Sequence, residues 1–206
     1  MELLCNLEPG TWNFPVNRIG LFGGSFDPVH LGHLLVAQAA CEEFNLDRLF
    51  FVPAAQSPLK PERIPAPPEV RLRMLRLALV GEPNYEVDDQ EIRRGGPSYT
   101  IDTVRAYRQL YPKASLFYII GADHVPLLPK WRAADELAAL VEFLVVPRPG
   151  DPPVAAKAPF RVQNLVGTPF AVSSSQIRTR VKSGKRIQDL VPAAVAEAIR
   201  NSGLYL

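Results

Sequence analysis

Residues 21–33 read LFGGSFDPVHLGH and follow the basic-apolar pair Arg18-Ile19. This order of residue types predicts a β-strand, a glycine turn and then a helix that begins with two histidines. Gly23 and Gly24 allow backbone geometry and a close approach that a side chain would block. The start of the helix offers unpaired N–H groups and a partial positive charge. A phosphate is the ligand that such a turn suits best.

Strand-like and helix-like runs alternate along the chain. The strand-like runs are 18–22, 48–52, 85–87, 115–120 and 143–146, and the helix-like runs are 31–44, 69–80 and 100–110. This order predicts an α/β fold of the Rossmann-like, doubly wound kind, with a mainly parallel sheet and helices on both faces. Ligands bind such sheets beyond the carboxyl ends of the strands. We expect the glycine turn and Gly121-Ala122-Asp123 at two such ends.

The chain has 206 residues, a length that suits one domain. We expect an N-terminal extension over 1–17 and a single domain over 18–206, whose C-terminal helical part spans about 173–206. A net charge of +2 gives no general case for a nucleic-acid or membrane partner. Residues 1–17 lack a signal-peptide pattern, and Cys5 and Cys41 form no C-x-x-C pair. We therefore expect a cytoplasmic protein, and leave open whether it forms a homo-oligomer.

His30 and His33 are three residues apart, so a helix places them on one face. They have three interpretations: contact with phosphate, a metal pair, or histidines without a ligand that serve only as a capping pair or are incidental. A metal site needs further ligands, and the sequence has neither an H-E-x-x-H pattern nor a cysteine cluster. Imidazoles can donate hydrogen bonds to a phosphate whose charge grows in a transition state. We favour phosphate contact and expect no metal ligated by the protein.

A second polar cluster, SSSQIR, occupies residues 173–178. Hydroxyl groups at the start of a helix, followed one turn later by Arg178, would grip a polyphosphate, because arginine makes forked hydrogen bonds to phosphate oxygens. The alternative is a serine N-cap on a solvated basic helix, which composition alone favours.

Three other features have two interpretations each. Residues 91–100 read EIRRGGPSYT, either a plain loop before a capped helix or a turn whose N–H groups receive a carboxylate. Trp131 either stacks on an aromatic ligand or packs in the core. Six prolines between residues 53 and 68 mark a loop containing Lys60, which is either a surface connection or a segment that closes over a ligand.

Together, residues 23–33 and 173–178 resemble the signatures of the HxGH nucleotidyltransferase superfamily. The closer resemblance, from about residue 18 to the end, is to the bacterial nicotinate-nucleotide adenylyltransferases. It includes further motifs in the same order, namely Val52-Pro53 with Lys60, residues 71–75, 96–103 and 120–123, Trp131, and residues 190–192. The P-loop and G-x-S-x-G patterns are absent from the sequence.

This resemblance implies a nucleotidyltransferase domain that acts in NAD biosynthesis. The implied reaction transfers the adenylyl group of ATP to nicotinate mononucleotide, giving nicotinate adenine dinucleotide and pyrophosphate. In the family the mononucleotide's phosphate attacks the α-phosphorus directly, without a covalent enzyme intermediate. Catalysis then depends on positioning and charge stabilisation. The implied cofactor is Mg²⁺, carried mainly by the phosphates of ATP.

The resemblance also implies roles for individual residues, with His30 and His33 as the catalytic pair. The implied ATP-binding residues are Gly23, Gly24, Ser25, Phe26, His30, His33, Lys60, Asp123, Ser174, Ser175 and Arg178. The implied mononucleotide-binding residues are Ser25, Tyr99, Thr100, Asp123 and Trp131. Among these, Asp123 would accept a ribose hydroxyl, the turn at Tyr99 and Thr100 would bind the nicotinate carboxylate, and Trp131 would stack on the ring.

Two departures from the family pattern and three alternative functions stand beside this interpretation. Leu59 occupies a position where the family often has histidine, and residues 1–17 have no counterpart. The alternative acceptors are nicotinamide mononucleotide and phosphopantetheine, but phosphopantetheine enzymes usually have threonine at the position of His30. A non-catalytic nucleotide-binding protein is the third alternative, and the intact pairs His30 with His33 and Ser175 with Arg178 argue against it.

Overall fold

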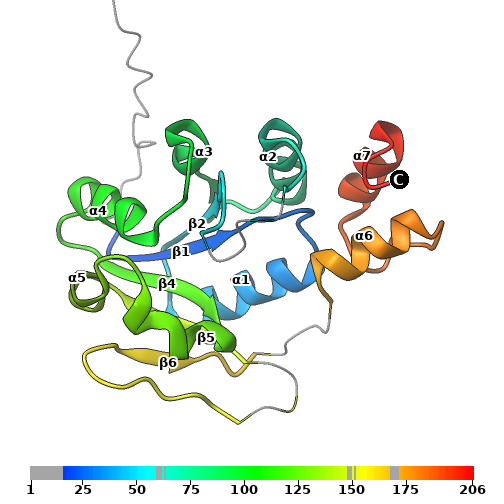
Figure 1. Cartoon of the computed structure of the whole chain (residues 1–206). Coiled ribbons are helices and arrows are strands. Elements are labelled where there is room, and N and C mark those ends of the chain that lie inside the picture. Colours follow the sequence, from blue (N-terminus) through cyan, green and yellow to red (C-terminus); the bar gives the residue numbers. More distant parts are fainter. Residues whose placement is uncertain (1–15, 59–61, 63, 148–149, 151, 168–171) are drawn as a thin grey trace, which may run out of the picture.

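The computed structural model describes residues 16–58, 62, 64–147, 150, 152–167 and 172–206. Its centre is a six-stranded sheet in the order β3-β2-β1-β4-β5-β6, in which every neighbouring pair is parallel (Figure 1). The strands are β1 (Arg18–Gly24), β2 (Arg48–Pro53), β3 (Tyr85–Val87), β4 (Ser115–Gly121), β5 (Glu142–Val146) and β6 (Val162–Asn164). This arrangement confirms the predicted α/β, doubly wound fold.

The helices connect these strands or follow the last of them, and they cover both faces of the sheet. They are α1 (Leu31–Phe44), α2 (Pro68–Ala78), α3 (Gln90–Arg94), α4 (Thr100–Leu110), the 3₁₀ segment η1 (Ala122–Lys130), α5 (Ala134–Leu140), α6 (Ser174–Lys182) and α7 (Ala193–Ser202). The ranges expected for α1 and α4 match the structure, and α2 ends two residues before its expected limit. None of the helices in the described ranges is long and apolar enough to cross a membrane.

Two apolar cores lie on opposite faces of the sheet. Residues of α1, α2, α6 and α7 form one core, and residues of α4, η1 and α5 form the other. Successive side chains of a strand point to opposite faces, so β1 contributes Phe22 to the first core and Leu21 to the second. Burial on both faces explains the near-continuous apolar character of the central strands.

The strand order reverses between β1 and β4, which are direct neighbours. The connection after β1 leads to β2 on one side, and the connection after β3 returns to β4 on the other. Open α/β sheets bind ligands in the crevice that such a reversal leaves beyond the carboxyl ends of the strands. Gly24 and Gly121 are the last residues of the two strands at this point, as predicted for the two glycine-containing segments.

Candidate active site

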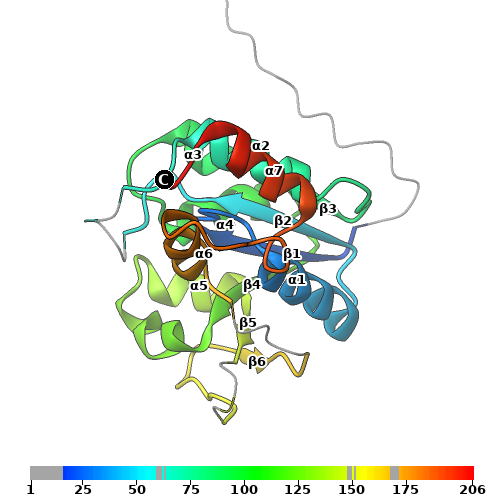
Figure 2. The same cartoon turned by 90° about the vertical axis from the view of Figure 1, so that its right-hand side faces the viewer.

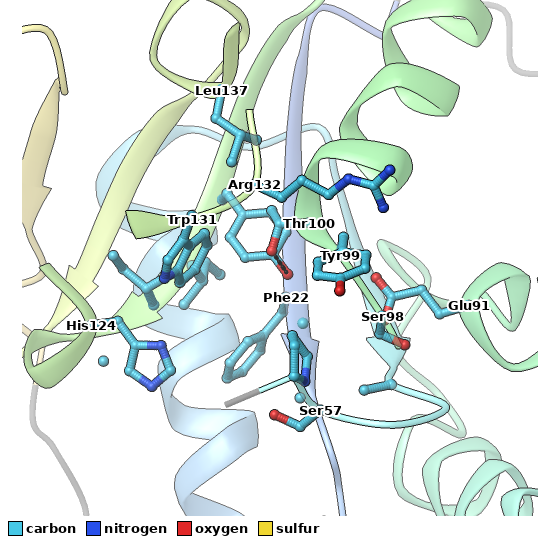
Figure 3. Close-up of a pocket in the computed structure, with 18 of the residues that line it drawn as sticks. Phe22, Ser57, Glu91, Ser98, Tyr99, Thr100, His124, Trp131, Arg132 and Leu137 are labelled. Carbon is cyan, nitrogen blue, oxygen red and sulfur yellow. Dashed lines mark hydrogen bonds between the residues drawn. The ribbon is translucent and has the colours of Figure 1, made fainter. Parts of the chain in front are cut away.

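A cleft of about 520 Å³ opens at the carboxyl ends of β1 and β4. Figure 3 shows Trp131 and His124 on one side of it and Tyr99, Ser98 and Glu91 on the other. Six of the residues expected to bind nucleotides line this cleft, namely Gly23, Gly24, Ser25, Tyr99, Thr100 and Trp131. The structure therefore brings the glycine turn, the start of α4 and the expected ring-stacking residue around one space.

Gly23 makes room for a tyrosine on the neighbouring strand. A Cβ atom at Gly23 would lie 2.1 Å from the hydroxyl oxygen of Tyr118, a distance that no side chain can accept. The Tyr118 side chain is buried, and its hydroxyl lies 3.4 Å from Oγ1 of Thr100. Gly23 thus makes room for the Tyr118 hydroxyl, whose contact with Thr100 connects β4 with the first turn of α4 at the cleft.

The two histidines form a stacked pair at the start of α1. The backbone N–H of His30 donates to Nδ1 of His33 over 3.2 Å, and the centroids of the two rings lie 3.6 Å apart. Because Nδ1 of a neutral His33 is the acceptor, its proton must be on Nε2. A neutral His33 can therefore still donate a hydrogen bond to a phosphate oxygen.

His30 is almost completely buried, at 6% exposure. Within the described part of the chain, its Nδ1 atom has no hydrogen-bond partner. A Cβ atom at Gly32 would lie 3.1 Å from this Nδ1, so the small residue between the histidines gives the His30 ring its place. A buried polar atom without a protein partner needs another explanation, and a bound ligand supplies one.

Burial keeps both imidazoles neutral at pH 7. It lowers the pKa of His30 from 6.5 to about 4. Burial, followed by the proximity of His30, also lowers the pKa of His33 well below 6.5. The pair therefore reaches a ligand as two neutral groups, and phosphate charge near them would favour their protonation.

Acidification from pH 8 to pH 5.5 should lower the free energy of unfolding. The pKa of His30 is lower in the folded chain, so its contribution is complete above pH 6.5 and is lost as pH falls toward 4. At pH 5.5 this loss should be about 1.4 kcal/mol for His30. Urea unfolding of the wild type and of His30→Gln would measure it. An equally steep pH dependence in the variant would contradict the assignment.

Phe26 supports the histidine pair from behind and does not line the cleft. It is 1% exposed, and its ring centroid lies 5.0 Å from that of His33 and 5.5 Å from that of Phe22. Its backbone has a φ of 46°, in the left-handed region that a bulky residue rarely adopts. The side chain of this expected ATP-binding residue is therefore part of the core that orients His33.

The serine-rich start of α6 docks on the turn before α1. Ser174 Oγ donates to the carbonyl oxygen of Pro28 over 2.9 Å, and Arg178 donates to the carbonyl oxygen of Asp27 over 2.7 Å. Arg178 also donates to Ser175 Oγ over 3.0 Å. Ser173 caps α6, as the alternative interpretation of this cluster predicted. Ser174 and Arg178 contact the turn that precedes His30. The structure thus joins two motifs that are far apart in the sequence.

The remaining expected residues have different placements. Asp123 lies in the first turn of η1, two residues after the end of β4, and is not among the residues that line the cleft. Its neighbour His124 does line it. Lys60 and residues 1–15 of the expected extension lie outside the described residues.

A buried carboxyl group at the cleft had no role assigned from the sequence. Glu91 is 3% exposed and accepts a hydrogen bond from Thr103 Oγ1 over 2.5 Å. Burial raises the pKa of Glu91, against the opposing effect of hydrogen bonds from Thr103 and Ser98. The contact ties α3 to the first turn of α4. In the sequence, only the position of Glu91 in the segment 91–100 indicated a role for it. Its contact with Thr103 is known only from the fold.

Comparisons with known proteins agree with this geometry. The model of the cytidylyltransferase-like family matches residues 21–180. A protein of Opitutus terrae named "Probable nicotinate-nucleotide adenylyltransferase" is 46% identical over 191 residues, which cover 91% of this chain and 97% of the relative. A protein of the same name from Thermus thermophilus is 44% identical over 189 residues, with 91% and 99% coverage.

A solved structure shares the fold. It is the nicotinic acid mononucleotide adenylyltransferase of Plasmodium falciparum complexed with NaAD, which superposes with a TM-score of 0.76 at 18% identity and covers 92% of this chain and 97% of its own. At this identity the likeness concerns the fold alone. The sequence matches go further: the chain belongs to the cytidylyltransferase-like family and, within it, to the nicotinate-nucleotide adenylyltransferases.

Proposed function

We propose that this protein transfers the adenylyl group of ATP to the phosphate of nicotinate mononucleotide and releases pyrophosphate. One observation carries the proposal: the stacked pair of His30 and His33 and the docked start of α6 lie beside a cleft formed by the glycine turn, the start of α4 and Trp131. The names of the relatives supply the substrates. Such a reaction would be a cytoplasmic step of NAD biosynthesis, without a nucleic-acid or membrane partner.

The histidine pair and α6 would hold the triphosphate. A phosphate oxygen of the mononucleotide attacks the α-phosphorus, and the bond to the β-phosphate oxygen breaks, so pyrophosphate leaves with the bonding electrons. The attacking oxygen is already ionised at pH 7, so no general base is needed. The work left to the protein is alignment and stabilisation of the charge on the phosphorus oxygens. Nε2–H of His33, the partial positive charge at the N-terminus of α1 and the guanidinium of Arg178 suit that task.

The cleft would hold the mononucleotide. The nicotinate carboxylate would bind at the N-terminus of α4, where Tyr99 precedes Thr100 and the first N–H groups of the helix have no partner within it. Trp131 would stack on the ring from the opposite wall of the cleft. Asp123 would accept a ribose hydroxyl, from a position next to the cleft-lining Gly121.

Mg²⁺ would enter with ATP. No group of three His, Cys, Asp or Glu residues that could hold a metal ion occurs in the described part of the chain. The donors at the site are imidazoles, hydroxyls, a guanidinium and backbone N–H groups, which suit phosphate oxygens better than a cation. Mg²⁺ commonly binds through substrate phosphates, so a MgATP complex fits these residues.

An acceptor panel tests the proposed reaction. With ATP and Mg²⁺, nicotinate mononucleotide should release pyrophosphate and give a product with the mass of nicotinate adenine dinucleotide. Nicotinamide mononucleotide lacks the charge-assisted bond to the start of α4, so its kcat/KM should be roughly ten- to a hundredfold lower. Phosphopantetheine should give no product. Turnover with phosphopantetheine alone, or tight ATP binding without turnover on any acceptor, would overturn the assignment.

A further inference from the structure

A buried carboxylate lies inside the proposed triphosphate site. Asp27 is 2% exposed and immediately precedes Pro28 in the turn between the glycines and the histidines. Its Oδ1 accepts hydrogen bonds from the backbone N–H of Ala66 over 3.2 Å and from the hydroxyl of Tyr205 over 2.7 Å. A buried charge of this kind is tolerated only where donors surround it.

The same aspartate holds the arginine that we assign to the triphosphate. Nη1 of Arg178 lies 2.7 Å from the carbonyl oxygen of Asp27 and 3.6 Å from its carboxylate oxygen Oδ2. Nη2 of Arg178 reaches Ser175. The backbone carbonyl and the carboxylate of Asp27 thus fix the position of the Arg178 guanidinium at the start of α6.

Tyr205 reaches this aspartate from the segment that follows α7. Figure 1 shows the C-terminus on the same side of the molecule as α6 and the end of β1, and Figure 2 views the molecule from that side. The backbone of Tyr205 has a φ of 70°, in the left-handed region, where a tyrosine is held only if its surroundings fix it. The hydrogen bond from its hydroxyl to Asp27 joins two residues that are 178 positions apart in the sequence.

We infer that Tyr205 is a positioning residue for the triphosphate of ATP, acting through Asp27 on Arg178. This inference rests on the proposed function, because it takes Arg178 as a ligand of the phosphates. The Tyr205 hydroxyl keeps one carboxylate oxygen occupied, which leaves the other facing the guanidinium. Without that donor the Asp27 side chain is freer to turn, and Arg178 loses a fixed partner beside the phosphates.

The charge of Asp27 makes this arrangement matter for binding. A carboxylate near a triphosphate repels it, unless the negative charge is balanced by donors and a cation. Loss of the Tyr205 hydroxyl removes one of the donors, so the effect should fall on ATP. The mononucleotide binds in the cleft, and none of Asp27, Arg178 and Tyr205 lines that cleft.

The test is Tyr205→Phe, which keeps the ring and removes only the hydroxyl. Its dissociation constant for a non-hydrolysable ATP analogue, measured by calorimetry, should rise roughly five- to tenfold. This is less than the roughly ten- to a hundredfold expected for a lost charge-assisted bond to the ligand itself, because the Tyr205 hydroxyl acts on ATP only through Asp27 and Arg178. The KM for the mononucleotide should stay the same. Tyr107→Phe is the matched control, because the Tyr107 hydroxyl donates to Asp88 over the same 2.7 Å at another part of the sheet. This control should leave analogue binding unchanged.

A double-mutant cycle tests the route through Asp27. Once Asp27→Asn has been introduced, adding Tyr205→Phe should weaken analogue binding by less than twofold. If Asp27→Asn fails to fold, the cycle is run with Arg178→Lys instead, with the same expectation. Independent, additive effects in the cycle that folds would overturn the proposed route.

The outcomes separate this inference from the proposed function. An unchanged dissociation constant in Tyr205→Phe, or equal weakening in Tyr205→Phe and Tyr107→Phe, overturns the positioning role. A wild-type protein that binds the ATP analogue but transfers the adenylyl group of ATP to no acceptor would contradict the proposed reaction. Even then, the dissociation constants for the analogue in the wild type and in Tyr205→Phe decide whether Tyr205 is a positioning residue.

Discussion

Replacing His33 with alanine should lower the turnover number by roughly 10²–10³-fold, the usual effect of deleting one donor to a transition-state oxyanion. The Nδ1 atom of His33 accepts the N–H of His30, so Nε2–H is the group left for the phosphate. Phe26 and Phe22 pack against the ring and fix its direction, which makes the donor preorganised. Steady-state pyrophosphate release with saturating ATP and nicotinate mononucleotide measures the effect.

Alanine also removes the acceptor for the His30 N–H, so a second variant separates folding from catalysis. The amide oxygen of His33→Asn can replace Nδ1 as that acceptor, but it supplies nothing at the position of Nε2. We expect His33→Asn to unfold at the wild-type temperature and to be as slow as His33→Ala. Near-normal turnover in either well-folded variant would remove His33 from the catalytic pair.

The sequence was enough to predict the fold because its longer elements are strongly patterned. Residues 31–44 and 100–110 have helical spacing over at least three turns, and the structure has helices with the same bounds. The unexpected elements are short or irregular: α3 has 5 residues, α5 has 7 and β6 has 3, and the nine-residue 3₁₀ segment η1 contains two prolines. Such segments are too brief or too irregular to show a period, and their conformation depends on the neighbouring chain.

The site could be predicted only where its residues are close together in the sequence. The run from Gly23 to His33 contains the glycine turn and both histidines, so one motif indicated a phosphate site. The sequence could not predict that Phe26 packs behind His33, because its role depends on the path of the turn. Contacts such as Tyr205 to Asp27 join residues 178 positions apart and leave no local pattern.

One missed residue did leave a signal. Arg71 lies four residues before Leu75 and seven before Ala78, so a helix places it on the same face as these apolar side chains. A charged residue on a buried face needs a structural reason. The structure supplies one, since Arg71 is 0% exposed and donates from Nε to Ala66 and from Nη1 to other loops.

Replacing Arg71 with methionine should lower the free energy of unfolding by about 3–5 kcal/mol, because three backbone carbonyls would lose a charged donor in the interior. The acceptors are Ala66 at 2.9 Å, Ser25 at 2.9 Å and Ala54 at 2.8 Å. Ser25 and Ala54 follow β1 and β2 and line the cleft, so the guanidinium ties together two loops of the active site. Urea denaturation measures the loss.

Methionine keeps much of the volume of the arginine stem, so this change isolates the guanidinium rather than creating a large cavity. Arg73→Met is the matched control, because Arg73 lies on the exposed side of α2 and should change stability by no more than about 0.5 kcal/mol. Arg71→Lys keeps the charge but has a single nitrogen for carbonyls on three segments, so its stability should fall between the wild type and Arg71→Met. Equal stabilities for Arg71→Met and Arg73→Met would mean that the buried guanidinium does not hold the two loops.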